Sequence, residues 1–398
     1  RNLMRKVADA YAGRGFIARA IERYLSLGET GRAVDLMEQA GENYYATGRW
    51  ETLSWWIDNL PKELLGEHPS LMVQRARICS ESGQNARALD LLEQAQSIYS
   101  RRGESARVET GRVLALRSSV LRIQDRYSDS IDYAQQALLA VGGDSLHERF
   151  IQAMAQKNLG LCCIWLGKLD EGLKSLRSAM RKYEELASPL DIGLIQHDLG
   201  LVQELTGNLA AAEKHYRSAL ATWQQLGNPS PWANELNSLG VIYSTQGKYS
   251  LAAESFSAAM EKALLIGDLR IQAYILAGQA DLQRELGNLE QARSAFERTL
   301  EVAQRANTAL MVTYALDGLA NIARLEGDFA QASYRLDEAL GYAQEHGSAY
   351  ELGLCNLSQG MLSNELGKVE NAQLHLEEAI NVFQGSGLQP LLARARQH

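Results

Sequence analysis

The stretch Leu199–Ala219, LGLVQELTGNLAAAEKHYRSA, contains the pattern that decides the fold. From Gly160 to Ala379 this pattern recurs every 40 residues, in six copies. Each copy has a small residue, a glycine seven residues later, and then large and small apolar residues at helical spacing. The small residues are Gly160, Gly200, Gly240, Ala280, Ala320 and Gly360, and the glycines are Gly167, Gly207, Gly247, Gly287, Gly327 and Gly367. A repeat of this length predicts a solenoid.

The chemistry of the repeated positions predicts a helix, a short turn and a second helix in each unit. The small residue of the first helix allows the second helix to approach closely. The glycine ends the first helix in a left-handed conformation, which is costly for a residue that has a side chain. One helical hairpin cannot bury both of its faces, so neighbouring hairpins must stack. We therefore expect an all-α, right-handed superhelical solenoid of antiparallel helix pairs.

The repeated residues resemble the tetratricopeptide repeat. One unit shows the matching positions Leu199, Gly200, Gly207, Leu209, Ala212, Tyr216 and Ala219. The usual period of that repeat is about 34 residues. The period here is 40 residues, so we expect longer helices or longer turns between units.

Composition agrees with a helical protein and argues against several classes. The 398 residues are 46% hydrophobic, and the net charge of −8 argues against a nucleic-acid-binding surface. Cys79, Cys162, Cys163 and Cys355 lack metal-binding spacing, so we expect reduced thiols in a cytosolic core. No apolar run reaches the ~20 residues that span a bilayer, and no signal peptide is evident. Because the chain begins at Arg1, we expect a cytoplasmic piece of a longer protein.

The repeat register predicts four segments. Residues 1–69 form a helical junction or N-terminal cap, residues 70–142 hold two imperfect repeats, residues 143–384 hold six regular repeats, and residues 385–398 begin a C-terminal capping helix. In the first segment we expect helices over Met4–Ala12, Phe16–Leu27, Thr30–Ala46 and Trp50–Leu60, separated at Gly28, Gly48 and Pro61. Gly83 and Asp125 take the turn positions of the two imperfect repeats.

The first segment also resembles the junction between the ATPase core and the sensor array of MalT-like regulators. Two phrases show this resemblance, AYAGRGFIARAIERYLSLGETGRAVDLMEQAG (Ala10–Gly41) and GRWETLSWWIDNLPKELLGEHPSL (Gly48–Leu71), the second through Trp55, Trp56, Leu60, Pro61, Pro69 and Leu71. Such regulators are signal-transduction ATPases with numerous domains, and they include many LuxR-type activators. The resemblance implies a missing ATPase and a missing DNA-binding part. The alternative is an ordinary cap of the repeat array with a buried tryptophan pair.

The sequence contains none of the common catalytic or metal-binding motifs. A P-loop, an H-E-x-x-H helix, a paired C-x-x-C and a G-x-S-x-G elbow are absent. The seven histidines are scattered, and none pairs with cysteine or carboxylate at metal-ligand spacing. We therefore expect no enzymatic activity, no cofactor and no metal.

Polar residues gather at the concave positions of the third to sixth repeats. The candidate ligand- or peptide-binding residues are Asn234, Asn237, Tyr274, Asp281, Arg284, Tyr314, Asp317, Asn321, Arg324 and Asn364. Asparagine amides can hold a peptide backbone through a donor and an acceptor, and tyrosines offer flat contact area with a polar tip. Arg284 and Arg324, one repeat apart, could grip a carboxylate or phosphate. The alternative is a solvated helix face on which Asp281 pairs with Arg284.

These observations predict the sensor arm of a cytosolic transcription regulator of the MalT-like type. A protein, a peptide or a small polar effector would bind in the concave groove and shift the parent from an inactive to a self-assembling state. Such a shift requires different affinities for the two states. We expect no direct contact of this chain with nucleic acid or membrane. The second hypothesis is a constitutive scaffold that binds an extended peptide in the groove, and the third is an enzyme.

Overall fold

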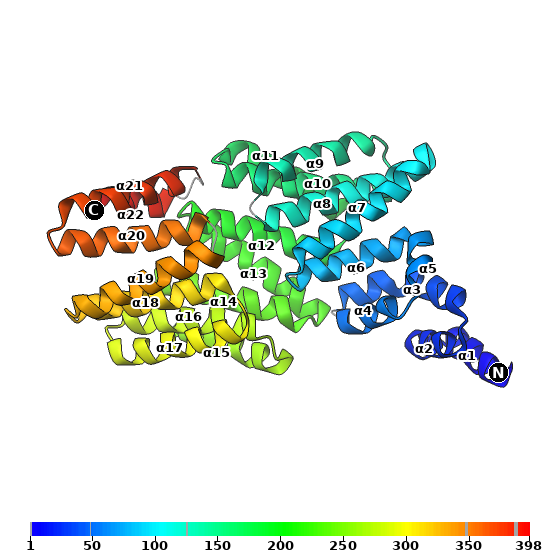
Figure 1. The fold of residues 1–398 in the computed structure, drawn as a ribbon, viewed down its shortest axis with the longest axis horizontal. Coiled ribbons are helices and arrows are strands. Elements are labelled where there is room, and N and C mark those ends of the chain that lie inside the picture. The colour runs from blue at the N-terminus through cyan, green and yellow to red at the C-terminus, as the bar shows by residue number, and fades with distance from the viewer. Residues whose placement is uncertain (1, 48, 125, 347–348, 386–388) are drawn as a thin grey trace. The chain divides into compact units, whose positions relative to one another are not determined.

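The computed structural model describes residues 2–47, 49–124, 126–346, 349–385 and 389–398. Within these ranges the chain forms α-helices and one short 3-10 helix, and no residue lies in a β-strand (Figure 1). The expected turn positions Gly48 and Asp125 lie outside the described residues. The helices are α1 (Asn2–Gly13), α2 (Ile17–Leu27), α3 (Thr30–Ala46), α4 (Trp50–Asp58), α5 (Lys62–Glu67), α6 (Pro69–Glu81), α7 (Asn85–Arg101), η1 (Gly103–Ala106), α8 (Arg107–Ile123), α9 (Tyr127–Ala140), α10 (Leu146–Trp165), α11 (Leu169–Glu185), α12 (Pro189–Leu205), α13 (Leu209–Leu226), α14 (Pro229–Thr245), α15 (Tyr249–Ile266), α16 (Leu269–Glu285), α17 (Leu289–Arg305), α18 (Ala309–Leu325), α19 (Phe329–His346), α20 (Ala349–Glu365), α21 (Val369–Gly385) and α22 (Gln389–Gln397). The predicted all-α solenoid of helix pairs is confirmed.

Internal contacts divide the chain into two compact units. Unit 1 comprises residues 1–162 and 177–186, and unit 2 comprises residues 163–176 and 187–398. The boundary passes through α10 and α11. The regular helix pairs α12–α21 all belong to unit 2.

A glycine in the left-handed conformation follows the first helix of each regular repeat, as the sequence predicts. Gly247, just after α14, has a φ of 72° and its N–H donates to the carbonyl of Ser244 at 2.8 Å. The N–H of Lys248 then donates to the carbonyl of Tyr243 at 2.8 Å, which completes the cap. Positive φ values occur likewise at Gly167 (78°), Gly207 (80°), Gly287 (79°), Gly327 (83°) and Gly367 (69°).

The small residues of the first helices lie against large residues of the second helices. A Cβ at Gly240 would stand 2.6 Å from the ring of Phe256 on α15, so a small residue is needed for this approach. Phe256 is 1% exposed and lies between the buried residues Ala252 and Ala259. The same small–large–small series is buried in the next two repeats, as Ala292, Phe296, Thr299 and as Ala332, Leu336, Ala339. Burial of one such large side chain contributes roughly 1.5–3 kcal/mol, so the repeated series forms the core.

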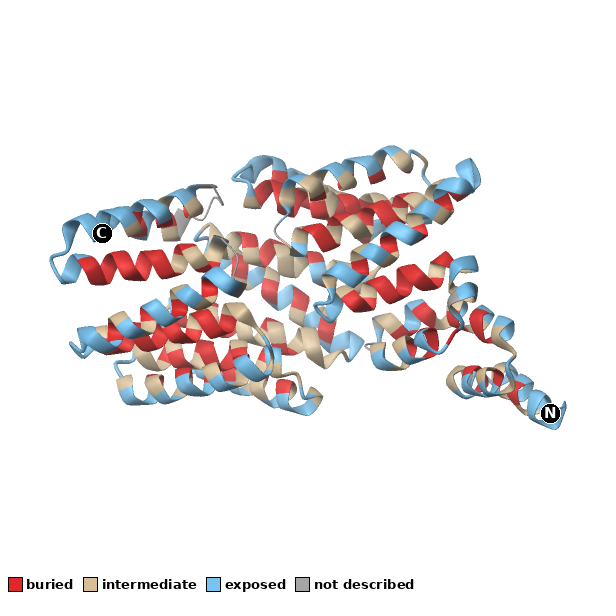
Figure 2. Cartoon of the chain, in the orientation of Figure 1, coloured by how far each residue is buried: buried red, intermediate tan, exposed pale blue. Residues whose placement is uncertain are grey.

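The first helices form the inner layer of unit 2. Contacts join α14 to α16, α16 to α18, and α18 to α20, while α13, α15, α17 and α19 each pack against the first helices that flank them. Figure 2 shows long runs of buried residues along α18 and α20. The first helices therefore form one layer of unit 2 and the second helices form the other.

The N-terminal segment of unit 1 is helical where the sequence predicts it. The ends of α1 to α4 lie within two residues of the expected bounds. The two adjacent tryptophans separate, because neighbouring residues on a helix point in different directions. Trp56 is fully buried with its ring 4.6 Å from that of Tyr44, whereas Trp55 is 53% exposed. The expectation of a buried tryptophan pair is therefore wrong for Trp55.

The remaining expectations concern thiols, metals and membranes. Cys79, Cys162, Cys163 and Cys355 are buried, and none of the four takes part in a disulfide. In the described part of the chain, no group of three or more His, Cys, Asp or Glu side chains is placed to hold a metal ion. None of the described helices has the length and apolar character that crossing a membrane requires.

Candidate functional site

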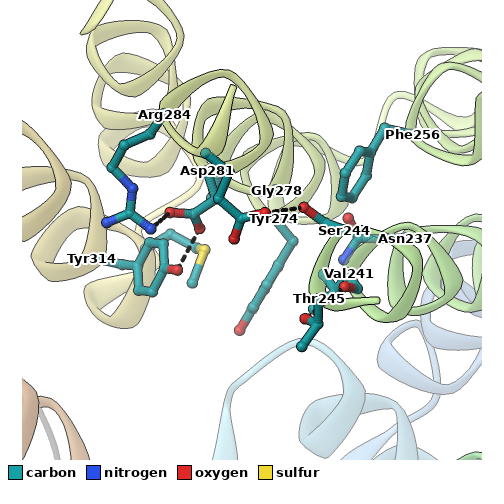
Figure 3. Close-up of a pocket in the computed structure, with 13 residues that line it drawn as sticks. Asn237, Val241, Ser244, Thr245, Phe256, Tyr274, Gly278, Asp281, Arg284 and Tyr314 are labelled. Atoms are coloured by element: carbon teal, nitrogen blue, oxygen red, sulfur yellow. Dashed lines mark hydrogen bonds and ion pairs between the residues drawn. The ribbon is translucent and has the colours of Figure 1, made fainter. Parts of the chain in front are cut away.

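Three successive first helices of unit 2, α14, α16 and α18, surround a cavity of about 330 Å³ (Figure 3). The lining residues are Asn237, Val241, Ser244, Thr245, Phe256, Tyr274, Ala277, Gly278, Asp281, Arg284, Glu285, Met311 and Tyr314. All of them except Phe256, which comes from α15, lie on first helices. The volume falls at the lower end of the roughly 300–1,000 Å³ that is typical of ligand pockets.

The repeat register explains why these residues meet. Positions three before, one after and four after the small residue of a first helix share one face of that helix. On α14 these positions are Asn237, Val241 and Ser244, and on α16 they are Ala277, Asp281 and Arg284. The cavity therefore lies between equivalent faces of neighbouring repeats.

Asp281 of α16 connects two repeats. Its Oδ1 accepts a hydrogen bond from Arg284 Nη2 at 2.6 Å, and its Oδ2 accepts one from Tyr314 Oη of α18 at 2.5 Å. Burial raises the pKa of Asp281, and the charge of Arg284 and the Tyr314 hydroxyl oppose that rise. The Asp281–Arg284 pair of the alternative interpretation is thus present, and Tyr314 extends it to the next repeat.

The α14 side of the cavity has one hydrogen bond to α16 and one acceptor atom without a partner among the described residues. Ser244 Oγ donates to Glu285 Oε2 of α16 at 2.7 Å and so connects the two helices. Asn237 Oδ1 is buried and has no hydrogen-bond partner in the described part of the chain. A buried polar atom without a partner costs roughly 1–3 kcal/mol. A ligand that brings a donor to Asn237 would recover this free energy.

The cavity brings together half of the ten candidate residues. Those that line it are Asn237, Tyr274, Asp281, Arg284 and Tyr314. Those outside the lining are Asn234, Asp317, Asn321, Arg324 and Asn364. Asn234 is half-buried on α14, and Asn364 is exposed near the end of α20.

Three of the candidates outside the cavity have partners within the fold. Asn321 Nδ2 donates to Asp317 Oδ2 and to the Asp317 carbonyl, each at 3.0 Å. Arg324 pairs with Glu365 of α20. Because Arg284 is also paired, an anion held between the two arginines would compete with a carboxylate of the chain at each of them.

Asp317 of α18 is a half-buried residue outside the cavity lining. Burial raises the pKa of Asp317 to about 6, although a hydrogen bond from Ser358 and the charges of Arg284 and Arg394 act against the rise. Its Oδ1 is buried and has no hydrogen-bond partner among the described residues. The inner face of α18 therefore holds a carboxyl that ionises at a higher pH than usual.

Sequence reasoning missed several lining residues. Val241 and Ser244 occupy the register positions predicted to be concave. They were not among the candidate binding residues, because only Asn, Asp, Arg and Tyr side chains were selected there. Glu285 lies one residue beyond the predicted face of α16, and Phe256 reaches the cavity from a second helix. Nothing in the repeat pattern marks Glu285 or Phe256 as lining residues.

The concave face is covered at its C-terminal end by the chain itself. Leu357 and Met361 of α20 are buried in a cluster with Leu392 of α22, and Trp165 and Leu205 pack against this cluster. These residues all belong to unit 2. The cavity therefore lies on the part of the inner layer that precedes α20.

Two family comparisons match most of the repeat array. The tetratricopeptide repeat family matches residues 151–225 and 191–264. The family of anaphase-promoting complex subunit 5 matches residues 243–325 and 319–396. No curated protein matches the sequence.

Several solved structures have a similar fold. A Rap protein complexed with competence and sporulation factor is 14% identical with a TM-score of 0.59, over 85% of this chain and 98% of that chain. The Rap conjugation gene regulator of the plasmid pLS20, in complex with a Phr peptide, is 12% identical with a TM-score of 0.56, over 96% and 97%. A signal transduction ATPase with numerous domains and a tetratricopeptide repeat sensor, from Pyrococcus horikoshii, is 15% identical with a TM-score of 0.59. The match covers 94% of this chain and 55% of that protein. At these identities the likeness shows the fold alone.

Proposed function

Since the chain is a helical-repeat protein of the tetratricopeptide type, we propose that its cavity binds a segment of an extended peptide and senses it. The observation that carries this proposal is a cavity lined by the first helices of three consecutive repeats. A ligand in it contacts three repeats at once. Because each repeat touches only its neighbours, such a ligand fixes the packing at two successive interfaces and hence the local curvature of the array.

The lining suits a peptide better than a purely apolar ligand. Asn237 lies in the lining and its buried Oδ1 has no partner among the described residues, and Tyr274 and Tyr314 add flat contact area. Two of the similar folds were solved with bound factors, competence and sporulation factor in one and a Phr peptide in the other. These complexes support a peptide as the class of ligand.

We propose further that the array is the sensor arm of a MalT-like or LuxR-type regulator, with the ATPase and DNA-binding parts elsewhere in the parent protein. The junction phrase Gly48–Leu71 supports this, as does the similar repeat sensor in a signal transduction ATPase. To move a two-state parent from 1:99 to 99:1, a ligand must bind one state about 5.5 kcal/mol more tightly than the other.

A constitutive scaffold is the second candidate, and one observation favours it. The bonds from Tyr314 to Asp281 and from Ser244 to Glu285 hold the three inner helices together without a ligand. A groove that is already formed suits permanent binding of a peptide. Small-angle scattering with and without a binding peptide separates the two, because only a sensor changes curvature on binding.

Filling the cavity tests the proposal. Ala277→Leu gives α16 the residue that α20 has at the same register position, Leu357. We expect this variant to bind pools of random hexapeptides at least ~10-fold more weakly in fluorescence anisotropy, a change of about 1.4 kcal/mol. The control is Ala330→Leu at an exposed position of α19. Equal binding by both variants would place the peptide outside this cavity.

A further inference from the structure

The charges around the cavity do not balance. Three lining residues carry charge at neutral pH, Asp281, Arg284 and Glu285. Arg284 Nη2 lies 2.6 Å from Asp281 Oδ1, so these two charges compensate each other. Glu285 accepts a hydrogen bond from the neutral Ser244 hydroxyl at 2.7 Å and takes part in no ion pair among the described residues. Glu285 is exposed, so it is a solvated carboxylate of the lining that remains available to pair with a cation.

The neutral lining groups favour a guest that is positively charged and rich in donors. Asn237 Oδ1 is an acceptor without a partner in the described part of the chain. Tyr274 and Tyr314 line the same space, whereas the Phe256 ring beside them is 1% exposed (Figure 3). The face of an aromatic ring attracts a cation within about 6 Å of its centre. Met311 adds apolar surface, which suits the methylene stem of a long cationic side chain.

A cation of α22 acts electrostatically on this face. Arg394 of α22 stands two repeats after Tyr314 in the register, and it is exposed. Burial raises the pKa of Asp281 and of Asp317, and the charge of Arg394 is among those that oppose the rise in both. The Arg394 charge therefore acts on both carboxyls, and a cationic ligand in the cavity would meet repulsion from Arg394.

We propose that the cavity binds an organic cation, supplied by an arginine or lysine side chain of the bound peptide. The inference rests on the proposed function and names the chemical class of its ligand. The cationic head takes Glu285 as its counter-charge and donates to Asn237, while the stem lies on the apolar and aromatic wall. A guanidinium offers five donors and an ammonium three, so arginine is preferred over lysine.

The test uses four pools of N-acetylated, C-amidated hexapeptides, each with Arg, Lys, Gln or Glu fixed at one position and mixed residues elsewhere. Fluorescence anisotropy at low salt should show the Arg and Lys pools binding at least ~10-fold more tightly than the Gln and Glu pools, as expected for a charge-assisted contact. Glu285→Gln should reduce this preference about fivefold, because the counter-charge is lost.

Two further variants sharpen the test. Arg394→Gln should raise the affinity for the Arg and Lys pools about twofold, and added salt should remove the gain, since the repulsion is screened. Glu290→Gln, at an exposed position of α17 outside the cavity, is the matched control and should change nothing. Circular dichroism and thermal unfolding confirm that each variant folds.

The outcomes separate the inference from the function on which it rests. Equal binding of all four pools, or a preference for the Glu pool, would overturn the cation and leave peptide binding in place. Binding of free arginine or spermidine as tight as that of the Arg pool would support the cation but overturn its peptide source. If no pool and no small amine binds, both the proposed function and this inference are wrong.

Discussion

Replacement of Gly247 by alanine should destabilise unit 2, whereas the same replacement at Gly341 should stabilise it. Gly247 has a φ of 72°, and an added Cβ would meet no atom within 4 Å. The whole effect in the folded state is therefore backbone strain, which costs roughly 1–2 kcal/mol in the left-handed region. The smaller freedom of alanine in the unfolded chain offsets about 0.4–1 kcal/mol. The expected net loss is about 1 kcal/mol.

Gly341 is the matched control because it differs from Gly247 in backbone conformation and not in space. It lies inside α19, and a Cβ there would also meet no atom within 4 Å. Alanine is favoured over glycine in a helix interior by roughly 0.5–1 kcal/mol. The same added methyl group is therefore expected to have opposite effects at the two positions.

The assay is thermal unfolding together with hydrogen exchange, because an array of repeats can unfold in parts. The amide of Lys248, bonded to the Tyr243 carbonyl at 2.8 Å, reports on the turn itself. A loss of about 1 kcal/mol should speed its exchange roughly fivefold in Gly247→Ala. Unchanged exchange with an unchanged melting temperature would show that the turn does not need a left-handed glycine, and the reasoning about all six turns would fail with it.

Three further expectations concern the inner layer of unit 2. Tyr314→Phe removes the 2.5 Å bond to Asp281 and should lower the free energy of unfolding by about 1–3 kcal/mol in urea denaturation, and an unchanged midpoint would contradict this. Burial raises the pKa of Asp317 to about 6, so its charge costs stability as pH rises from about 4 to 6; Asp317→Asn should remove this loss from the melting temperatures. Burial lowers the pKa of His197, but the carboxylate of Glu235, whose Oε1 lies 2.9 Å from Nδ1, raises it overall. That pair should stabilise the fold below about pH 6.5 and lose its contribution above the raised pKa, which an NMR titration of His197 and the variant His197→Gln would check.

The turns and the core could be predicted from the sequence because their causes are local. The turn at Gly247 ends α14 through two backbone hydrogen bonds. The N–H of Gly247 donates to the carbonyl three residues before it, and the N–H of Lys248 donates to the carbonyl five residues before it. Phe256 is buried against Gly240, which lies 16 residues away in the same hairpin. A periodic pattern contains both relations, since each unit repeats them. Trp55 and Trp56 show the limit of such a prediction. The two adjacent tryptophans are the same residue type, yet Trp56 is buried and Trp55 is exposed.

The occupancy of the concave face could not be predicted in the same way. The register identified the face on which Arg284 and Arg324 lie, but not whether they are free. Arg324 pairs with Glu365, 41 residues further along, and that contact depends on how two successive repeats rotate against each other. A one-repeat pattern contains no information about such a partner. The same applies to Leu357, which is covered by residues from α22 and from the end of α10.

The position of the cavity has a simpler cause in side-chain volume. Three residues before the small position, the first helices present His197, Asn237, Ala277, Asp317 and Leu357 in turn. Alanine is the smallest of these, and Gly278 follows it on α16, so the middle helix of the three has little side-chain volume at these two positions of the lining. The neighbouring residues Val241 and Met311 line this space without filling it. The repeat that departs from its neighbours by having the smallest side chain at this position is therefore the one that makes room for a ligand. The variant Ala277→Leu, which fills this space with the residue that α20 has at the same position, is the most direct test of whether a ligand occupies the cavity.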